Sequence, residues 1–172
     1  MSPLVLVDAT ADDIGVLERA IHAAWRWREA WDEDSFTRHR ATCGADSYID
    51  DFGRRAGDIG VIARDSGTGR AIGAAWCRFF TVVDHRAGFL AEDVPELVVA
   101  VEQEARGRGV GRALMEALLH RAREYGVDRV SLHVSRENDR ARRLYEALGF
   151  SDSGCGDEQG AVLVRSTANV PR

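Results

Sequence analysis

A glycine-rich segment, Arg106–Arg112, constrains the fold of this chain more than any other feature. It follows an apolar run, Leu97–Val101, and opens a run that carries leucine, methionine and alanine at helical spacing. This order predicts a buried strand, a tight turn and a helix. Such a turn aims several backbone N–H groups at one point, at the positive end of a helix dipole, and that arrangement binds phosphate. Residues 96–125 therefore predict a site for a phosphorylated ligand.

Three glycine-rich phosphate motifs compete for this segment. The dinucleotide fingerprint G-x-G-x-x-G fits poorly, because Arg112 stands where the third glycine belongs and only Asp128 is available as the ribose-binding acid. The P-loop requires a lysine, and the sequence contains none. The remaining pattern is R-x-x-G-x-G, filled by Arg106, Gly109 and Gly111. This pattern favours a phosphate ligand other than a dinucleotide or a P-loop nucleotide.

Two blocks of the sequence resemble the GNAT superfamily of acyl-CoA-dependent N-acyltransferases. The first block, Val99–Leu114, looks like the acetyl-CoA motif of that family. The second contains Val130–Val134, Asn138 and Leu144–Phe150, and it looks like the next strand and helix. The blocks lie within residues 96–150, about a third of the chain, and their order and spacing both fit. One departure is Gln103, where the family often has proline; the position is a loop, so the departure puts little in doubt.

The resemblance implies acetyl-CoA as the cosubstrate and assigns residues to it. The turn would hold the pyrophosphate through its backbone N–H groups. The backbone of the preceding strand would pair with the pantetheine arm like an added strand. Asn138 resembles the asparagine that lies near the cofactor arm in this family. An asparagine before a helix is also a good N-cap, and both interpretations can hold together. The cofactor-binding residues expected are Val99, Ala100, Val101, Arg106, Gly107, Arg108, Gly109, Val110, Gly111, Arg112, Asn138 and Tyr145.

Acetyl transfer also needs groups that move protons. Tyr145 is the expected general acid, because a nearby phenol can protonate the leaving thiolate. Without the resemblance of Leu144–Phe150 to the family, Tyr145 would be interpreted as a half-buried aromatic residue. Glu96, at the mouth of the strand, is the first choice for the general base. His133 and a base acting through water stay open as alternatives. Trp31 and Phe79 are the aromatic residues expected to line the acceptor side.

Composition narrows the class of protein further. A chain of 172 residues favours one domain, residues 1–172. A net charge of −5 argues against nucleic acid as the main partner. Cys43, Cys77 and Cys155 lack C-x-x-C spacing, which suggests a reducing compartment, and the histidines show no metal-ligand spacing. With neither a signal peptide nor a run of membrane-spanning length, a cytoplasmic protein without membrane contact is expected.

Hydrophobic periodicity predicts the remaining elements. Thr10, with Asp13 three residues later, should cap a helix that carries apolar residues up to Trp25, and a second helix should begin near Asp34 or Ser35. Other helices are expected at 111–125 and 139–148. The expected strands are 4–8, 58–64, 71–80, 97–101, 129–134, 151–155 and 161–166. The strand–helix–strand unit implies a parallel pair, and the hairpins imply antiparallel ones. The prediction is an α/β fold with a mixed, largely antiparallel twisted sheet of about six to seven strands and helices on both faces.

Two functions of different classes fit these observations. The first is an acetyl-CoA-dependent N-acetyltransferase that acts on the primary amine of a small molecule or a peptide. The second is a non-catalytic module that binds acyl-CoA as a sensor or partner domain. Tyr145 favours the enzyme, because a sensor needs no proton donor at that position. The acceptor amine, the acyl chain preference and the oligomeric state, with a homodimer among the options, stay open.

Overall fold

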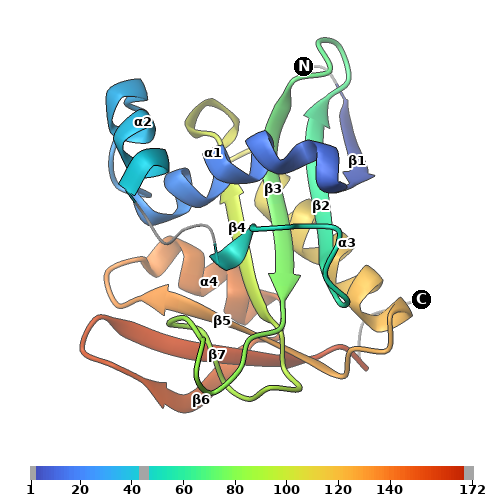
Figure 1. The fold of residues 1–172 in the computed structure, drawn as a ribbon, viewed down its shortest axis with the longest axis vertical. Helices are drawn as coiled ribbons and strands as arrows, with labels where there is room; N and C mark the ends of the chain where they lie inside the picture. Colours follow the sequence, from blue (N-terminus) through green and yellow to red (C-terminus); the bar gives the residue numbers. More distant parts are fainter. Residues whose placement is uncertain (1–2, 43–46, 169–172) are drawn as a thin grey trace. The chain divides into compact units, whose positions relative to one another are not determined.

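The structure is a computed structural model that describes residues 3–42 and 47–168, so Cys43 lies outside the described residues. Figure 1 shows the elements in chain order. The strands are β1 (Leu4–Asp8), β2 (Ile59–Asp65), β3 (Ala71–Arg78), β4 (Glu96–Val101), β5 (Arg129–Ser135), β6 (Ser151–Gly156) and β7 (Gly160–Ser166). The helices are α1 (Ile14–Trp25), α2 (Glu33–Thr42), α3 (Val110–Glu124) and α4 (Asp139–Ala147), with short 3₁₀ turns η1 (Ala11–Asp13) and η3 (Gln103–Ala105).

The strands form a mixed sheet in the hydrogen-bonded order β1-β2-β3-β4-β5-β7-β6. β1 is antiparallel to β2, from the pair Leu4 and Asp65 to the pair Asp8 and Val61. β4 and β5 are parallel, while β5 and β6 are each antiparallel to β7. The predicted α/β fold and its mixed sheet are confirmed.

The chain divides into two compact units. The first unit contains residues 1–76 and 98–118, and the second contains residues 77–97 and 119–172. β4 begins in the second unit with Glu96 and ends in the first with Val101. Each unit is described by itself below.

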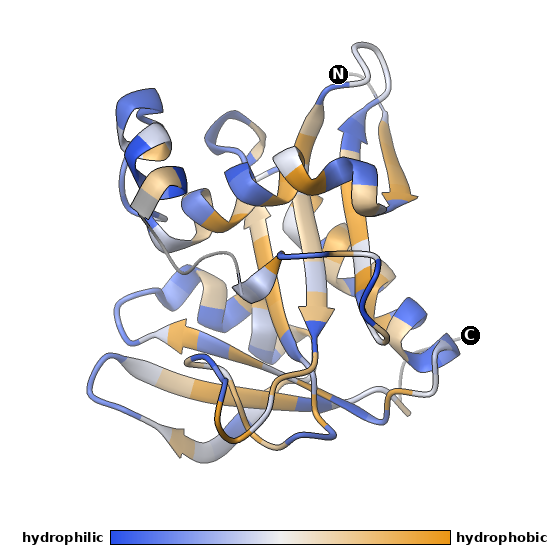
Figure 2. Ribbon diagram, viewed as in Figure 1, coloured by the Kyte–Doolittle hydropathy of each residue, from blue (hydrophilic) through white to orange (hydrophobic). Residues whose placement is uncertain are grey.

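The first unit has an apolar core between β2, β3 and its helices. Leu17 of α1, Val61 and Ile62 of β2, and Leu114 of α3 are fully buried. Trp76 is buried as well, and its indole N–H donates to the carbonyl oxygen of Tyr48 at 3.0 Å, so its polar atom is satisfied. Figure 2 shows hydrophobic residues along β2 and β3 and an alternation of hydrophobic and hydrophilic residues on α1. This pattern buries one face of α1 against the sheet.

The second unit is held by the β5–β7 ladder. The register runs from Arg129 opposite Ser166 to Ser135 opposite Gly160. Val130 and Leu132 of β5 and Leu163 of β7 are buried, together with Leu119 and Ala122 from the last turns of α3. At the end of β4, Glu96 pairs with Ser131 of β5. This unit therefore contains the first two residues of β4 and all of β5.

Local sequence explains where the elements begin and turn. Thr10 and Asp13 form the predicted capping box: the Thr10 hydroxyl accepts from the backbone, and Asp13 accepts from the Thr10 N–H at 2.9 Å. The β2–β3 turn is held by Asp65, whose carboxylate accepts from Gly67 N and Thr68 N at 3.0 Å each. Observed ends differ from the predicted ones by a residue or two; α1 begins at Ile14, for example, because the capped turn before it is 3₁₀.

Candidate active site

The glycine-rich turn of the first unit contains two glycines with a left-handed backbone. Gly107 and Gly109 both have φ of +80°, in the left-handed region that L side chains avoid. α3 begins directly after them at Val110, and no acidic side chain occupies its first turn. The turn itself is exposed at Gly107, Arg108 and Gly109. A helix N-terminus with no carboxylate in its first turn, entered through two glycines, suits an anionic group such as a pyrophosphate.

In the part of β4 that belongs to the first unit, the peptide N–H and C=O groups point alternately toward β3 and away from it. The N–H of Glu102 donates to the carbonyl oxygen of Ile72 on β3 at 2.9 Å. Because peptide groups alternate sides along a strand, those of Val101 and Val99 point away from β3. These are two of the three strand residues that the sequence assigns to the pantetheine arm. Their backbone direction is the one that pairing with an added strand requires.

Arg106 has a different environment from the rest of the turn. Its Nε donates to the carbonyl oxygen of Val101 at 3.1 Å, and its Nη1 donates to that of Trp27 at 3.0 Å. The side chain therefore ties the end of β4 to the segment that follows α1. Through these two hydrogen bonds the side chain of Arg106 has a structural role.

A pocket of about 470 Å³ lies in the first unit beside these residues. Small residues of α1, β3 and β4 form part of its lining, among them Ala20, Ala71, Gly73 and Ala100. Charged side chains of both signs line the rest, among them Arg70, which pairs with Glu102 at 3.0 Å and with Glu104 at 2.9 Å. Trp31, expected on the acceptor side, also lines this pocket, and the Arg19 guanidinium lies 4.1 Å from the centre of its ring.

In the second unit, Glu96 is the first residue of β4 and is 3 % exposed. Its Oε1 accepts a hydrogen bond from the backbone N–H of Gly88 at 3.0 Å. Ser131, the β5 partner of Glu96, donates through its hydroxyl to the carbonyl oxygen of the same Gly88 at 2.7 Å. The segment before β4 thus holds the carboxylate of Glu96 in one place.

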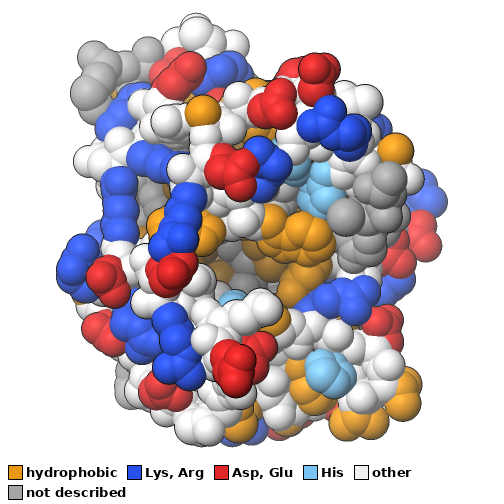
Figure 3. Space-filling view, turned by 90° about the vertical axis from the view of Figure 1, so that its left-hand side faces the viewer, with side chains coloured by type: hydrophobic (Ala, Val, Ile, Leu, Met, Phe, Trp, Pro, Cys, Tyr) orange, Lys and Arg blue, Asp and Glu red, His pale blue; other side chains and the backbone are white. Residues whose placement is uncertain are grey.

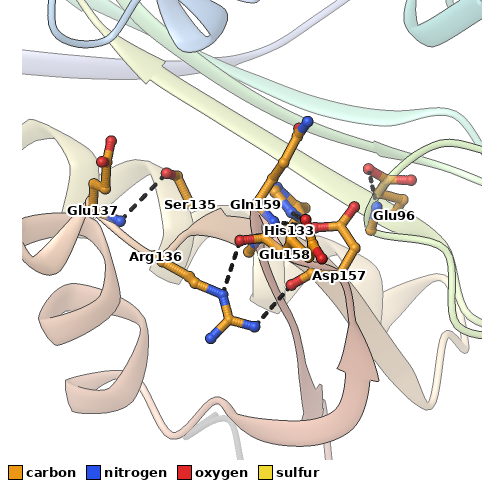
Figure 4. Close-up of polar contacts among 10 residues, drawn as sticks. Glu96, His133, Ser135, Arg136, Glu137, Asp157, Glu158 and Gln159 are labelled. Carbon is orange, nitrogen blue, oxygen red and sulfur yellow. Dashed lines mark hydrogen bonds and ion pairs between the residues drawn. The ribbon is translucent and has the colours of Figure 1, made fainter.

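His133 lies two residues beyond Ser131 on β5, on the same face of the strand. Its Nε2 is 4.0 Å from Oδ1 of Asp157, which lies in the turn between β6 and β7 (Figure 4). Burial lowers the pKa of His133 more than the Asp157 carboxylate raises it. Hydrogen bonds from the backbone N–H groups of Gln159 and Gly160 lower the pKa of Asp157. At neutral pH this pair is therefore a neutral imidazole facing a carboxylate.

Three further predicted site residues belong to the second unit, two of them on or beside α4 and one just after β3. Tyr145 is 8 % exposed, and burial raises the pKa of its phenol to about 12. Its ring packs against Phe150 with 6.0 Å between centroids. Asn138 caps α4 by accepting from Ala141 N at 3.1 Å, so the helix-cap interpretation is confirmed. Phe79 is half-buried just after β3.

The sequence interpretation missed two side-chain pairs. Asp157 was not singled out, because only the register of β5 with β7 brings its turn to His133. The pairing of His22 on α1 with His39 on α2, with 2.7 Å between their Nδ1 atoms, was missed for a similar reason. The presence of Asp157 in a turn rich in glycine was the one available signal, because a turn can present a carboxylate to a neighbouring strand.

The surface drawn in Figure 3 carries charges of both signs. Figure 3 shows acidic and basic side chains interspersed on one face, without the single-sign basic stripe typical of nucleic-acid binding. No helix in the described ranges combines the length and apolar character needed to cross a membrane. Within residues 3–42 and 47–168 there is no group of three or more His, Cys, Asp or Glu side chains that could hold a metal ion.

Comparison with known proteins identifies the class. Residues 21–150 match the acetyltransferase (GNAT) family, so this chain belongs to that family. It is 40 % identical over 90 residues to a mycothiol acetyltransferase of Beutenbergia cavernae, which covers 52 % of this chain and 27 % of that protein. It is 46 % identical over 65 residues to a mycothiol acetyltransferase of Corynebacterium aurimucosum, which covers 36 % of this chain and 21 % of that protein. The chain therefore matches only about a quarter of the length of these curated relatives.

Solved structures show the same fold. The PaiA N-acetyltransferase of Thermoplasma acidophilum, in complex with coenzyme A, has a TM-score of 0.70 at 13 % identity, covering 95 % of this chain and 99 % of that one. A phosphinothricin acetyltransferase of Sinorhizobium meliloti, in complex with acetyl-CoA, has a TM-score of 0.63 at 22 % identity, covering 96 % and 89 %. At these identities the likeness concerns the fold, and the predicted resemblance to the GNAT superfamily is confirmed.

Proposed function

We propose that this protein is an acetyl-CoA-dependent N-acetyltransferase that acts on the primary amine of a small molecule or a peptide. The observation that carries the proposal is the turn before α3, where Gly107 and Gly109 both have φ of +80° at a helix N-terminus free of acidic side chains. This is a cradle for a pyrophosphate in a chain of the GNAT family.

The residues of the first unit fit coenzyme A. The backbone N–H groups of Arg106–Arg112 would hold the pyrophosphate, and Gly109 and Gly111 let the backbone approach it closely. Val99 and Val101 would pair with the pantetheine arm through their backbone, since their peptide groups point away from β3, and Ala100 between them is proposed to contact the arm. When bound, acetyl-CoA supplies an activated acyl group as a thioester.

The residues of the second unit supply proton chemistry. Glu96 is proposed as the general base, with its carboxylate held by Gly88. Tyr145 is proposed as the general acid; because burial raises the pKa of its phenol to about 12, the ring stays protonated and able to donate. Asn138 is proposed to contact the cofactor arm while it caps α4. Trp31 and Phe79 are proposed to face the acceptor.

The acceptor is proposed to be compact. The pocket of about 470 Å³ that Trp31 lines has the size of a small-molecule site, and its lining combines small apolar residues with charged groups of both signs. The mycothiol acetyltransferase relatives are consistent with a small amine. A cytoplasmic location is proposed with it, because acetyl-CoA and reduced thiols share that compartment.

A screen of amines for thiol release from acetyl-CoA tests the proposal. Small amines, amino acids, polyamines and short peptides are each incubated with acetyl-CoA and the protein, and free thiol is measured against a sample without amine. Release that depends on one amine class establishes the enzyme and names its acceptor. Tight binding of acetyl-CoA by calorimetry, without release for any amine, would instead favour the acyl-CoA-binding sensor.

A further inference from the structure

Gly88, Glu96 and Ser131 form a closed set of contacts inside the second unit. Glu96 of β4 and Ser131 of β5 lie opposite each other where these two parallel strands pair. Oε1 of Glu96 accepts a hydrogen bond from the backbone N–H of Gly88 at 3.0 Å, which is the dashed line at Glu96 in Figure 4. The hydroxyl of Ser131 donates to the carbonyl oxygen of the same Gly88 at 2.7 Å. The strand pairing and the two bonds to Gly88 therefore hold the three residues together.

All three residues are withdrawn from solvent. Gly88 is buried, Glu96 is 3 % exposed and Ser131 is 0 % exposed. In such surroundings a hydrogen bond is electrostatically stronger than in water, and its loss leaves a polar group away from water. Solvent therefore does not easily replace either bond to Gly88 when one partner is removed.

Ser131 is a polar residue at a position where packing alone favours an apolar one. Its neighbours along β5, Val130 and Leu132, are buried and apolar. Burying a hydroxyl costs free energy unless the hydroxyl is hydrogen-bonded, and an alanine at this position would carry no such cost. What the serine adds is thus its bond of 2.7 Å to Gly88.

The two bonds to Gly88 restrict the peptide groups on both sides of this residue. The N–H that Glu96 accepts belongs to the peptide before Gly88, and the carbonyl that Ser131 binds belongs to the peptide after it. Glycine has more backbone freedom than any other residue, so a glycine held at only one of these groups can still rotate. A larger residue cannot supply the restraint, because a Cβ on Gly88 would lie 2.6 Å from Oε1 of Glu96. The hydroxyl of Ser131 therefore limits where the Gly88 N–H can point.

We infer that Ser131 positions the proposed base: through Gly88 it holds the carboxylate of Glu96 in the orientation in which that carboxylate takes a proton. The inference rests on the proposed function, in which Glu96 is the general base. A general base must lie within hydrogen-bond reach of the proton that it takes, so its contribution to the rate depends on its orientation. Neighbouring residues keep such an orientation by packing and by hydrogen bonds to the catalytic group. Because Ser131 acts through Gly88, it is a positioning residue.

One variant with a matched control tests the inference on the full-length protein. Ser131→Ala removes the hydroxyl and keeps a small side chain. Ser153→Ala is the control, because the Ser153 hydroxyl also donates at 2.7 Å to a backbone carbonyl oxygen of the second unit, that of Val162. Ser131→Ala is made in the unmodified protein and in Glu96→Gln. kcat and KM are measured with the amine that the thiol-release screen identifies, acetyl-CoA affinity by calorimetry, and the amide proton resonance of Gly88 by NMR.

Ser131→Ala should lower kcat about tenfold, less than loss of the base itself, and leave KM and acetyl-CoA affinity nearly unchanged. In the Glu96→Gln background the same change should lower kcat no further, because the carboxylate on which Ser131 acts is gone. A merely structural role would lower kcat alike in both backgrounds. The Gly88 amide proton should move upfield in Ser131→Ala, as its bond to Glu96 weakens. Ser153→Ala should match the unmodified protein in each of these measurements.

Three outcomes would contradict the expectation in different ways. Equal losses of kcat in the two backgrounds, or an unchanged kcat in Ser131→Ala, overturn the inference. The NMR comparison needs no substrate, and a Gly88 resonance that stays in place refutes the effect of Ser131 on Gly88 whatever the activity. Absence of acetyl transfer by the unmodified protein with every amine refutes the proposed function, and the role of Ser131 toward a general base fails with it.

Discussion

The backbone N–H of Gly88 donates a hydrogen bond of 3.0 Å to Oε1 of Glu96, and both residues belong to the second unit. The contact leaves no room for a side chain at Gly88: a Cβ there would lie 2.6 Å from that same oxygen. Gly88 therefore determines where the proposed base can place its carboxylate.

Gly88→Ala should move the carboxylate of Glu96 and lower kcat on the order of 10²-fold, the lower end for loss of a general base. Acetyl-CoA affinity should stay the same, because Gly88 and Glu96 are not among the residues proposed to bind the cofactor. Steady-state kinetics measure kcat, and calorimetry measures acetyl-CoA affinity. Gly15→Ala on α1, where a Cβ would meet nothing within 4 Å, is the control and should keep full activity. Equal rates for the two variants would contradict the role of Gly88.

Glu96→Gln should lower the rate mainly at neutral pH and recover partly at alkaline pH. The amide keeps an oxygen for the Gly88 N–H but cannot take a proton. At higher pH more of the amine is neutral, so the missing base matters less. A profile of kcat/KM against pH for the variant and the unmodified protein gives the result. An unaltered profile would assign the role of Glu96 to water or to His133.

The order of the elements around the site was predictable from the sequence because each depends on local pattern. The apolar run up to Val101, the glycines at 107 and 109, and the helical spacing after Val110 specify a strand, a turn and a helix within a short stretch. The left-handed φ of Gly107 and Gly109 fits the need for glycine at these positions. The predicted position of Glu96 at the mouth of the strand agrees with its place as the first residue of β4.

Contacts between distant parts of the chain could not be predicted in the same way. The side chain of Arg106 donates a hydrogen bond to the backbone carbonyl oxygen of Trp27, a residue far from it in the sequence. Asp157 meets His133 only because β7 pairs with β5 in one register, and a register is set by packing across the sheet rather than by local sequence. Pattern alone places such residues on an element but does not say which partner they meet.

Gly111→Val should abolish acetyl-CoA binding and leave the protein folded. Gly111 is the second residue of α3, where a larger side chain would keep the backbone from approaching the pyrophosphate. Gly15→Val is a matched control, because Gly15 is the second residue of α1 and has open space around it. Calorimetry measures acetyl-CoA affinity, and circular dichroism spectra show whether the variant is folded. Unchanged affinity in the Gly111 variant would refute this placement of the phosphate site.

His22 and His39 should make the protein less stable in acid. Their Nδ1 atoms are 2.7 Å apart, so one ring donates to the other, and burial followed by the nearby His39 lowers the pKa of His22. The unfolded chain therefore binds protons more readily than the folded one below about pH 6.5. The free energy of unfolding should be highest above that pH and fall as the pH falls.

Urea unfolding at about pH 7.5 and about pH 5.5 measures this effect. His39→Gln removes one of the two charges that would repel each other in acid, so the difference in unfolding free energy between the two pH values should shrink. His133 contributes to the acid sensitivity in the same direction, since burial lowers its pKa too. His120→Gln serves as the control. A pH dependence that His39→Gln leaves intact would show that the pair does not cause it.

Tyr145→Phe should lower kcat on the order of 10²-fold, the low end for a general acid, because a thiolate is already a fair leaving group. A proton donor helps only as the C–S bond breaks, so its effect belongs to the transition state, while the ring keeps its packing against Phe150. Acetyl-CoA affinity should therefore change little. Since burial raises the pKa of the phenol to about 12, the unmodified protein should show no loss of rate from ionisation of Tyr145 at any ordinary assay pH. Steady-state kinetics measure kcat, and a binding titration measures acetyl-CoA affinity. Full activity in the variant would show that Tyr145 is not the general acid, and the proposed cofactor site would be unaffected by that result.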